Sequence, residues 1–391
     1  MIKATGAAPQ VPLGSARPAQ PTTTETPGAP AGDRFSPSPA VPRLEEVVAR
    51  LPKVDLHRHL EGSITPETFL SLAEKHQIAL PSHDLETLRP YLQITPTDKT
   101  LLDFLKKFDT IGLAFKNKEA CRDATEGVIR DAARDNVKYL ELRFSPIYMA
   151  AQYGLPLEDV MDGVVEGVAN ASAETGTKVG LIVIVERQMG PEKAKVAEQL
   201  AERYKDRGVV ALDLANDEFH FPPGPYAEVF QQAKAAGLKV TVHAGEAGGA
   251  DNVRTAIEAL GADRIGHGVR AQEDPQVEQL VRDLRVPLEM NPTSNMQTGA
   301  ASGWDTYPLQ RFYKEGIPVT INTDDPAVSG ITLSHEYQTA VEQCGLSVEG
   351  LETAIMNAAD AAFLPADEKR ALSSLLLREI ADVEAWRLSA H

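Results

Sequence analysis

The sequence predicts an α/β protein with a TIM (β/α)8 barrel, built as a single domain over residues 43–391 behind a disordered N-terminal tail. Three observations favour this fold. Short apolar runs alternate with longer helical patterns from Leu44 onward, which is typical of a parallel sheet with crossover helices. The number of runs, eight over about 280 residues, is that of a TIM barrel. Several runs are followed directly by histidines or carboxylates, as at the carboxyl ends of barrel strands.

Eight apolar runs are the predicted strands, and many are apolar almost throughout, as expected of parallel strands buried on both faces. They are residues 53–56, 139–144, 179–185, 209–214, 239–242, 264–265, 286–290 and 318–321. Helical patterns between them include 157–175, 193–207, 226–236, 252–260 and 275–284. A doubly wound open sheet is the alternative, but the glycine-rich phosphate loop that usually follows its first strand does not occur in the sequence.

The first 42 residues differ from the rest. They hold nine of the 27 prolines and are otherwise mostly Ala, Thr, Gly and Ser. Such a segment buries too little apolar surface to offset its ordering entropy, so we expect a disordered tail. It lacks the apolar core of a secretory signal, and with only two cysteines in the chain we expect a cytoplasmic protein.

Charge and composition exclude several classes of protein. Lys plus Arg number 39 and Asp plus Glu number 56, a net charge of −17. This balance argues against a nucleic-acid binder and against docking on anionic lipid. No run of about 18 apolar residues could span a membrane. Two cysteines exclude a disulfide framework and an all-cysteine zinc site. Nothing in the sequence indicates an obligate protein partner.

Polar side chains with metal-binding or acid–base chemistry follow four of the predicted strands. Residues two apart on a strand share a face, so His57 and His59 can aim at one point. The carboxyl ends of barrel strands meet at one face, where active sites are built. The side chains concerned are His57 and His59 in DLHRH, His243 and Glu246 in VHAGE, His267 in GHG, and Asp324 and Asp325 in NTDD.

Three imidazoles and a carboxylate suit a single catalytic zinc ion, which typically takes three protein ligands and a water. We predict His57, His59, His243 and Asp324 as its ligands. Zinc lowers the pKa of bound water toward neutrality and so generates a hydroxide nucleophile.

The remaining side chains supply the other roles. Glu246 is the candidate proton donor, and His267 is a base or an electrostatic partner for the hydroxide. Asp325 lies next to a metal ligand and can bind a substrate nitrogen. These residue types predict a hydrolase with one zinc per chain and leave its substrate open.

Five motifs resemble those of the adenosine deaminases, zinc enzymes of the amidohydrolase superfamily, and the resemblance spans about residues 48–385. The motifs are DLHRHLEG at 55–62, TVHAGE at 241–246, RIGHGV at 264–269, TSNMQT at 293–298 and INTDDP at 321–326. The resemblance implies a TIM barrel that deaminates adenosine and 2′-deoxyadenosine to inosine and 2′-deoxyinosine with release of ammonia, a step of purine salvage. The partner is then a small purine nucleoside.

The resemblance also assigns roles. It implies that a zinc-activated hydroxide attacks purine C6 while Glu246 protonates N1. His267 and Asp324 would orient and deprotonate the water, and Asp325 would bond N7. His59 would contact substrate as well as metal.

A helical apolar stripe lies ahead of the second predicted strand. Leu101, Phe104, Leu105 and Phe108 recur at i, i+3, i+4 and i+7, which predicts an amphipathic helix. It is either a core-facing helix or, as the resemblance implies, an apolar gate over the nucleoside.

Two positions depart from the family pattern. Glu61 stands where the nucleoside deaminases usually have the Asp that bonds the ribose 5′-hydroxyl, and its extra methylene moves that contact outward by about 1.5 Å. Asn216 replaces a glycine whose N–H bonds purine N3, and Asn tolerates left-handed backbone better than most residues. Asp217 and Glu218 are predicted to be solvated acids. These departures leave adenine, or a 5′-substituted adenosine such as aminodeoxyfutalosine, as alternative substrates.

Two further classes are less favoured. A dihydroorotase-like or phosphotriesterase-like enzyme usually needs two metals bridged by a modified lysine at a strand end, and no suitable lysine ends a predicted strand. A catalytically inactive homologue would lack some of the metal and catalytic residues, all of which are present.

Overall fold

The computed structural model describes residues 42–98 and 101–389, although Leu101 and Leu102 are described in their backbone only. The predicted tail over residues 1–42 therefore lies almost entirely outside the described residues. Whether this tail is disordered therefore stays a prediction.

Eight parallel strands form one sheet whose spatial order is the sequence order, β1 to β8. The strands are β1 (Lys53–His59), β2 (Val137–Phe144), β3 (Lys178–Glu186), β4 (Val209–Ala215), β5 (Lys239–Ala244), β6 (Arg264–His267), β7 (Leu288–Met290) and β8 (Val319–Ile321). Sequential order throughout is the topology of a TIM barrel, which confirms the predicted fold, and the doubly wound alternative is wrong.

The barrel closes between its last and first strands just beyond the end of β8. The N–H of His59 donates to the carbonyl of Asp324 at 2.8 Å, and the N–H of Asp324 donates to the carbonyl of His57 at 2.8 Å. Arg58 and Asp324 form a parallel bridge. This closure places Asp324, which is distant in sequence, directly beside the two histidines of β1.

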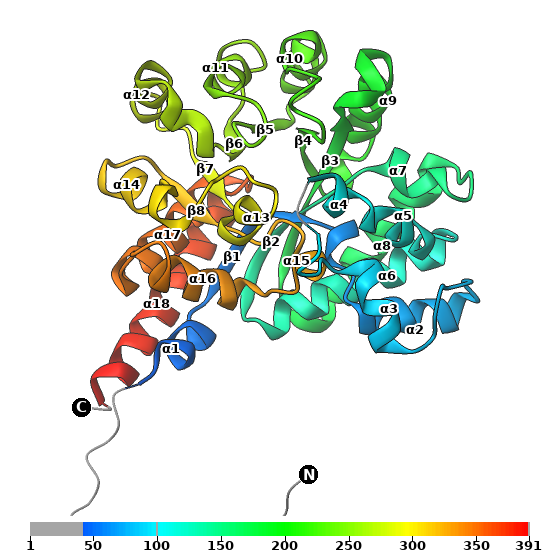
Figure 1. Ribbon diagram of the computed structural model, residues 1–391, viewed down its shortest axis with the longest axis horizontal. Coiled ribbons are helices and arrows are strands. Elements are labelled where there is room, and N and C mark those ends of the chain that lie inside the picture. The colour runs from blue at the N-terminus through cyan, green and yellow to red at the C-terminus, as the bar shows by residue number, and fades with distance from the viewer. Residues whose placement is uncertain (1–41, 99–100, 390–391) are drawn as a thin grey trace, which may run out of the picture. The chain divides into compact units, whose positions relative to one another are not determined.

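Helices surround the strands (Figure 1). They are α1 (Leu44–Arg50), α2 (Pro66–His76), α3 (Leu85–Leu92), α4 (Leu101–Leu105), α5 (Lys107–Ile111), α6 (Lys118–Arg134), α7 (Pro146–Ala151), α8 (Leu157–Thr175), α9 (Gly190–Arg203), α10 (Ala227–Ala235), α11 (Ala250–Glu258), α12 (Pro275–Asp283), α13 (Pro292–Gln297), α14 (Leu309–Lys314), α15 (Pro326–Ser329), α16 (Leu333–Glu342), α17 (Val348–Ala361) and α18 (Ala366–Ser389). Side-chain caps such as Thr65, Asn117 and Ser347 begin several of them by accepting hydrogen bonds from first-turn N–H groups.

The predicted boundaries agree with the structure to within a few residues, with two informative differences. β1 continues through His59 instead of stopping at residue 56, because its last residues pair with β2 and with Asp324. The apolar stripe at 101–108 is not one helix: α4 ends at Leu105 and α5 begins at Lys107. Periodicity alone did not indicate this break.

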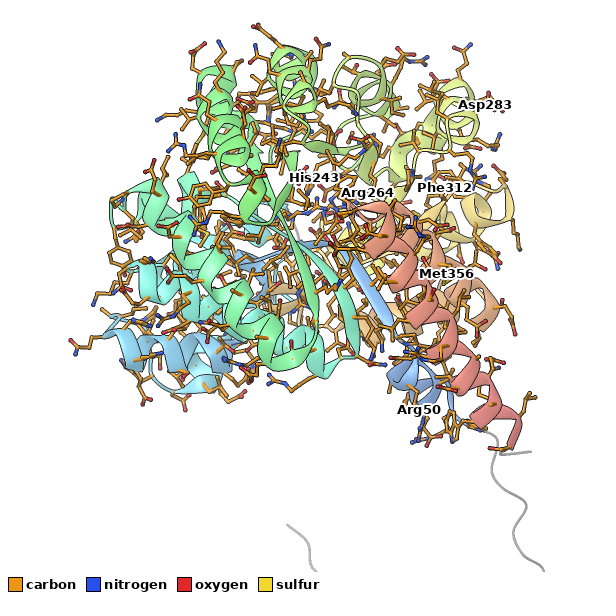
Figure 2. The ribbon with its side chains drawn as sticks, turned by 180° about the vertical axis from the view of Figure 1, so that it is seen from behind. Arg50, His243, Arg264, Asp283, Phe312 and Met356 are labelled. Atoms are coloured by element: carbon orange, nitrogen blue, oxygen red, sulfur yellow. The ribbon has the colours of Figure 1, made fainter. Side chains whose placement is uncertain are left out.

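Apolar side chains fill the layer between strands and helices, whereas the barrel interior holds buried charges. Arg143 and Arg264 are almost fully buried and pair there with Glu141, Asp213 and Glu289. Arg264 and His243 lie toward the middle of the ring of helices (Figure 2). None of the described helices combines the length and the apolar composition that a membrane span requires.

Candidate metal centre and active site

Four of the predicted ligands converge at the carboxyl end of the barrel. One ligand atom from each of His57, His59, His243 and Asp324 lies within 4.8 Å of the others. The Nε2 atoms of His57 and His59 are each 3.2 Å from Oδ1 of Asp324, and Nε2 of His59 is 3.2 Å from Nε2 of His243. Nε2 of His57 is buried and has no hydrogen-bond partner in the described chain. Three imidazoles and a carboxylate at this spacing fit one zinc-sized ion.

Buried carboxylates fix the orientation of two of these rings. Nδ1 of His57 is 2.7 Å from Oε2 of Glu289, and Nδ1 of His243 is 3.1 Å from Asp213. Both carboxylates also pair with Arg143, at 2.8 Å each. A carboxylate at Nδ1 holds the proton on that nitrogen, so the lone pair of Nε2 faces the other ligands.

These carboxylates remain ionised despite their burial. Burial opposes ionisation of Glu289, but the charges of Arg143 and Arg264 hold its pKa well below the usual value. Burial likewise opposes ionisation of Asp213, and His243 and Arg143 hold its pKa below the usual range. The polar interior of the barrel is therefore a network of paired charges beside the candidate metal ligands.

Two glycines give the site the space that it needs. A Cβ on Gly266 would lie 2.9 Å from Cε1 of His57. A Cβ on Gly62 would lie 1.8 Å from Oδ1 of Asp325. Both glycines stand in the motifs that the sequence singled out, and each is required by close approach of a neighbouring side chain.

Glu246 and His267 lie beside the ligand cluster. Oε2 of Glu246 is 3.5 Å from Nε2 of His267, which is 4.0 Å from Oδ2 of Asp324. Burial, followed by repulsion from Asp324 and Glu218, raises the pKa of Glu246 to about 8. Its carboxyl group is therefore protonated at neutral pH and able to donate.

The hydrogen bonds of His267 determine which of its nitrogens carries a proton. Nδ2 of Asn291 donates to the carbonyl of Glu289, which fixes the amide orientation, and lies 3.1 Å from Nδ1 of His267. Nδ2 of Asn295 lies 2.9 Å from the same Nδ1. Burial lowers the pKa of His267, so its ring is neutral at pH 7. With Nδ1 accepting, Nε2 presents an N–H to the site.

The expectation that Glu218 is a solvated acid is wrong. Glu218 is buried and accepts hydrogen bonds from the backbone N–H groups of four consecutive residues, 245–248, at 2.7–3.0 Å. The loop that carries Glu246 leaves these donors without carbonyl partners, and a buried carboxylate satisfies them. Asp217 agrees better with expectation, since it is partly exposed and pairs with His220.

The predicted substrate-binding acids lie on the wall of a cavity of about 440 Å³ above the ligand cluster. Asp325 is buried, and its Oδ1 has no hydrogen-bond partner among the described residues. Burial, together with repulsion from neighbouring carboxylates, raises its pKa well above the usual value although His59 opposes the shift. Glu61 accepts from the N–H of Ser145 at 2.7 Å, its Oε2 is buried without a partner, and burial raises its pKa to about 7.

Asn216 follows β4 on the same cavity wall. It adopts the left-handed backbone that its glycine-like position suggested, with φ of 76°. Its Nδ2 is 3.4 Å from Oε2 of Glu186, which lines the cavity and accepts from the hydroxyl of Ser145 at 2.5 Å. The sequence did not single out Glu186 or Ser145. No lysine or arginine is among the described side chains that line this cavity.

The predicted gate residues also reach this cavity. Phe104, Leu105 and Phe108 line it, although Phe104 is buried and Leu105 is partly exposed. The rings of Phe104 and Phe108 lie 6.1 Å apart across the junction between α4 and α5. Leu101 begins α4, but its side chain lies outside the described part of the chain.

Sequence reasoning missed the residues that support the site. These are Arg143, Asp213, Glu218 and Glu289, together with Glu186 and Ser145 on the cavity wall. A signal was present for three of them: Arg143, Asp213 and Glu289 are charged residues inside otherwise apolar strand runs, where only a paired charge is tolerated.

Comparison with known proteins identifies a family. The sequence model described as adenosine deaminase matches residues 52–379. The adenosine deaminase of Edwardsiella ictaluri is 42% identical over 324 residues, which cover 83% of this chain and 97% of the relative. The solved structure of adenine deaminase from Arthrobacter aurescens is similar, with 29% sequence identity and a TM-score of 0.77 over 85% of this chain and 98% of that chain. The structure of N6-methyl-AMP deaminase from Arabidopsis thaliana is similar too, with 28% identity and a TM-score of 0.74 over 85% of this chain and 98% of that chain. The substrates in these names differ.

Proposed function

The chain belongs to the adenosine deaminase family, as its motifs predicted, and we propose that it hydrolyses adenosine and 2′-deoxyadenosine to inosine and 2′-deoxyinosine with release of ammonia. One observation carries the proposal. The four candidate metal-ligand side chains lie beside Glu246, whose pKa is raised by burial, at the floor of a cavity that no described lysine or arginine lines. In cells such a reaction would serve purine salvage.

We assign one zinc ion per chain to His57, His59, His243 and Asp324. The donor set suits zinc, and the unpartnered, buried Nε2 of His57 fits a ligand atom. When bound there, zinc would lower the pKa of a water molecule and supply the nucleophile at neutral pH.

The chain's own residues would then bind the purine and move protons. Glu246 and Asp325 are both carboxyl groups with raised pKa values, so each can donate a hydrogen bond. Purine N1 and N7 are acceptors on the two sides of C6. We assign Glu246 to protonate N1, which makes C6 more electrophilic, and Asp325 to donate to N7.

His267 would hold the attacking oxygen by donation from Nε2. Because its neutral ring already carries the proton on that atom, the carboxylate of Asp324 is better placed to accept a proton from the water. Of the two roles expected for His267, this favours the electrostatic one over the base.

The ribose would lie toward the acids on the far wall. Oε2 of Glu61 has no hydrogen-bond partner among the described residues. Ser145 connects the two acids, since its N–H donates to Glu61 and its hydroxyl donates to Glu186. None of the described side chains that line the cavity is a lysine or an arginine. Carboxylates in such surroundings favour hydroxyl groups over a phosphate, because a second negative charge would be repelled. We therefore assign nucleosides, not nucleotides, as the substrates. Phe104, Leu105 and Phe108 would exclude water above them.

A second candidate is the deamination of free adenine or of a 5′-substituted adenosine. The observation in its favour is Glu61, which is longer than the usual Asp and is held by Ser145. The similar structure of an adenine deaminase is consistent with it.

An ultraviolet assay on the metal-analysed protein tests both candidates. Adenosine, 2′-deoxyadenosine, adenine and a 5′-thioether adenosine are compared by kcat/KM. Faster loss of the adenosine band with about one zinc per chain supports the nucleoside assignment. Preference for adenine or the thioether by about tenfold, or about 1.4 kcal/mol in transition-state binding, would overturn it. Loss of activity in Glu246→Ala with zinc retained would separate an enzyme from a nucleoside-binding protein.

A further inference from the structure

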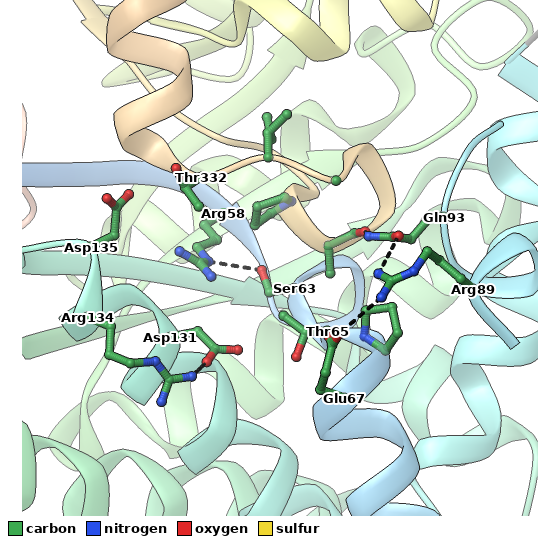
Figure 3. A pocket seen from close by; sticks show the side chains of 15 residues that line it. Arg58, Ser63, Thr65, Glu67, Arg89, Gln93, Asp131, Arg134, Asp135 and Thr332 are labelled. Atoms are coloured by element: carbon green, nitrogen blue, oxygen red, sulfur yellow. Dashed lines mark hydrogen bonds and ion pairs between the residues drawn. The ribbon is translucent and has the colours of Figure 1, made fainter. Parts of the chain in front are cut away.

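A second cavity, of about 480 Å³, is lined by Arg58 of β1 (Figure 3). Arg58 stands between His57 and His59 in β1, and alternation along a strand directs its side chain away from theirs. The cavity is walled by the start of α2, the end of α6 and the loop that precedes α16. None of the active-site roles assigned above uses it.

Arg58 is the unusual residue of this cavity. It is only 5% exposed, and Nε donates to Oγ of Ser63 at 3.0 Å. Within the described chain, its two terminal amino groups have neither a hydrogen bond nor an ion pair. A buried guanidinium is costly unless its donors are paired. The fork of Arg58 therefore offers donors to whatever enters the cavity.

The other charges on the cavity wall have hydrogen-bond partners of their own, although Oδ2 of Asp131 is buried without one among the described residues and the charge of Asp135 stabilises that of Arg58. Glu67 pairs with Arg89 at 3.0 Å, Asp131 pairs with Arg134, and Asp135 accepts from the N–H and hydroxyl of Ser334 at 2.9 and 2.5 Å. Arg58 is thus left as the cation without a counterion at hydrogen-bond distance.

Two helix N-termini also border this cavity. α2 and α16 have 11 and 10 residues, and their capping residues, Thr65 and Thr332, both line the cavity. The positive end of a helix favours an anion at its first turn. An acid already lies at each end, since Glu67 is in the first turn of α2 and Asp135 accepts from the N–H of Ser334 in α16. The free donors of Arg58, and not the helix ends, are therefore the main attraction for an anion.

We propose that this cavity binds a small organic anion through a phosphate or carboxylate group held by Arg58. Both groups match the planar fork of a guanidinium, which binds them bidentately. The cavity exceeds the size of a bare oxyanion, so the ligand carries further atoms. Because the backbone of Arg58 is bridged to Asp324, an anion here would contact the back of the metal-ligand segment without entering the active site.

Calorimetric titration of the metal-loaded full chain tests the proposal. The probes are inorganic phosphate, ribose 5-phosphate and succinate, at constant ionic strength set with chloride. The variant is Arg58→Gln and the matched control is Arg203→Gln, which removes an exposed, paired arginine that lines neither cavity. We expect saturable binding that Arg58→Gln weakens by at least about tenfold, or about 1.4 kcal/mol, and that Arg203→Gln leaves unchanged. If ribose 5-phosphate binds with the lower Kd, phosphate is the preferred group; if succinate does, carboxylate is.

A second variant covers the outcome in which Arg58→Gln fails to fold or loses metal. Ile331→Asp introduces a carboxylate on the cavity wall, away from the metal ligands, and should abolish binding with the metal content unchanged. The proposal is overturned if the wild-type chain shows no saturable binding. It is also overturned if binding survives Ile331→Asp, since the anion would then lie elsewhere, such as at the metal.

Discussion

The carboxylate of Glu289 should control zinc affinity although it touches no metal. Its Oε2 lies 2.7 Å from Nδ1 of His57 and 2.8 Å from Arg143, and its Oε1 accepts from Thr241 at 3.0 Å and from Arg264 at 2.5 Å. The change Glu289→Gln keeps the size of the side chain but removes its charge. His57 then loses the anion that holds its Nδ1 proton and its ring orientation.

Two effects of this change can be given a magnitude. Loss of a carboxylate that orients a metal-binding histidine typically lowers metal affinity by about 10- to 100-fold, or about 1.4–2.7 kcal/mol. Removing one partner of a buried ion pair costs about 3–5 kcal/mol of stability, because Arg143 and Arg264 both lose a counterion. The variant should therefore be less stable and should release zinc more readily.

Glu141→Gln is the matched control for stability. Glu141 is equally buried and pairs with Arg264 and the hydroxyl of Tyr139, but it contacts no predicted metal ligand. Zinc affinity is measured by competition with a chelator, and stability by denaturant unfolding of the metal-free protein. We expect both variants to lose stability and only Glu289→Gln to lose zinc affinity. Equal zinc affinity in Glu289→Gln and the wild-type chain would refute the reasoning.

Three further predictions concern the reaction and its substrate. Glu246→Gln should lower kcat by about 10²- to 10⁴-fold with zinc content unchanged, because the amide cannot protonate N1; a residual activity near that of the wild type would contradict its role. Since Glu246 acts in its protonated form, kcat/KM should fall as pH rises through the pKa of Glu246, which is about 8 and becomes somewhat lower when a cation is bound nearby. Glu218→Gln removes a repelling charge and should shift this decrease in kcat/KM to lower pH. A kcat/KM that stays constant up to about pH 10 would exclude the protonated role of Glu246. Gly62→Ala should raise KM for adenosine because the new Cβ would displace Asp325. Gly303→Ala is the control and should leave KM unchanged, because no described atom lies within 4 Å of a Cβ at that position. An equal change of KM in both variants would show that the contact between Gly62 and Asp325 does not position the substrate.

The barrel and the convergence of the four candidate metal ligands were predictable because their signals are local. Apolar runs and helical periods depend on neighbouring residues, so strands and the helix at 157–175 were located within a few residues. The side chains directly after a strand must lie at one face of a barrel, which brought His57, His243 and Asp324 together before any contact was known. The left-handed backbone at Asn216 follows from the same local preference.

The supporting contacts were not predictable because they join distant residues. Glu218 appears in sequence as one more acid after a strand, and its burial depends on four N–H groups of the loop after β5. The break between α4 and α5 was not predictable either, because the apolar residues keep the helical spacing on both sides of it.

By itself, the sequence determined the order of strands and helices, the family and the set of candidate metal-binding side chains, since each depends on residues close together in the chain. Only the tertiary structure decided which carboxylates stay charged, which nitrogen of His267 carries the proton and that Arg58 faces a cavity with no ion pair among the described residues. Those properties depend on burial and on partners brought together by folding, because the energy of a charge is set by its surroundings and not by its place in the sequence.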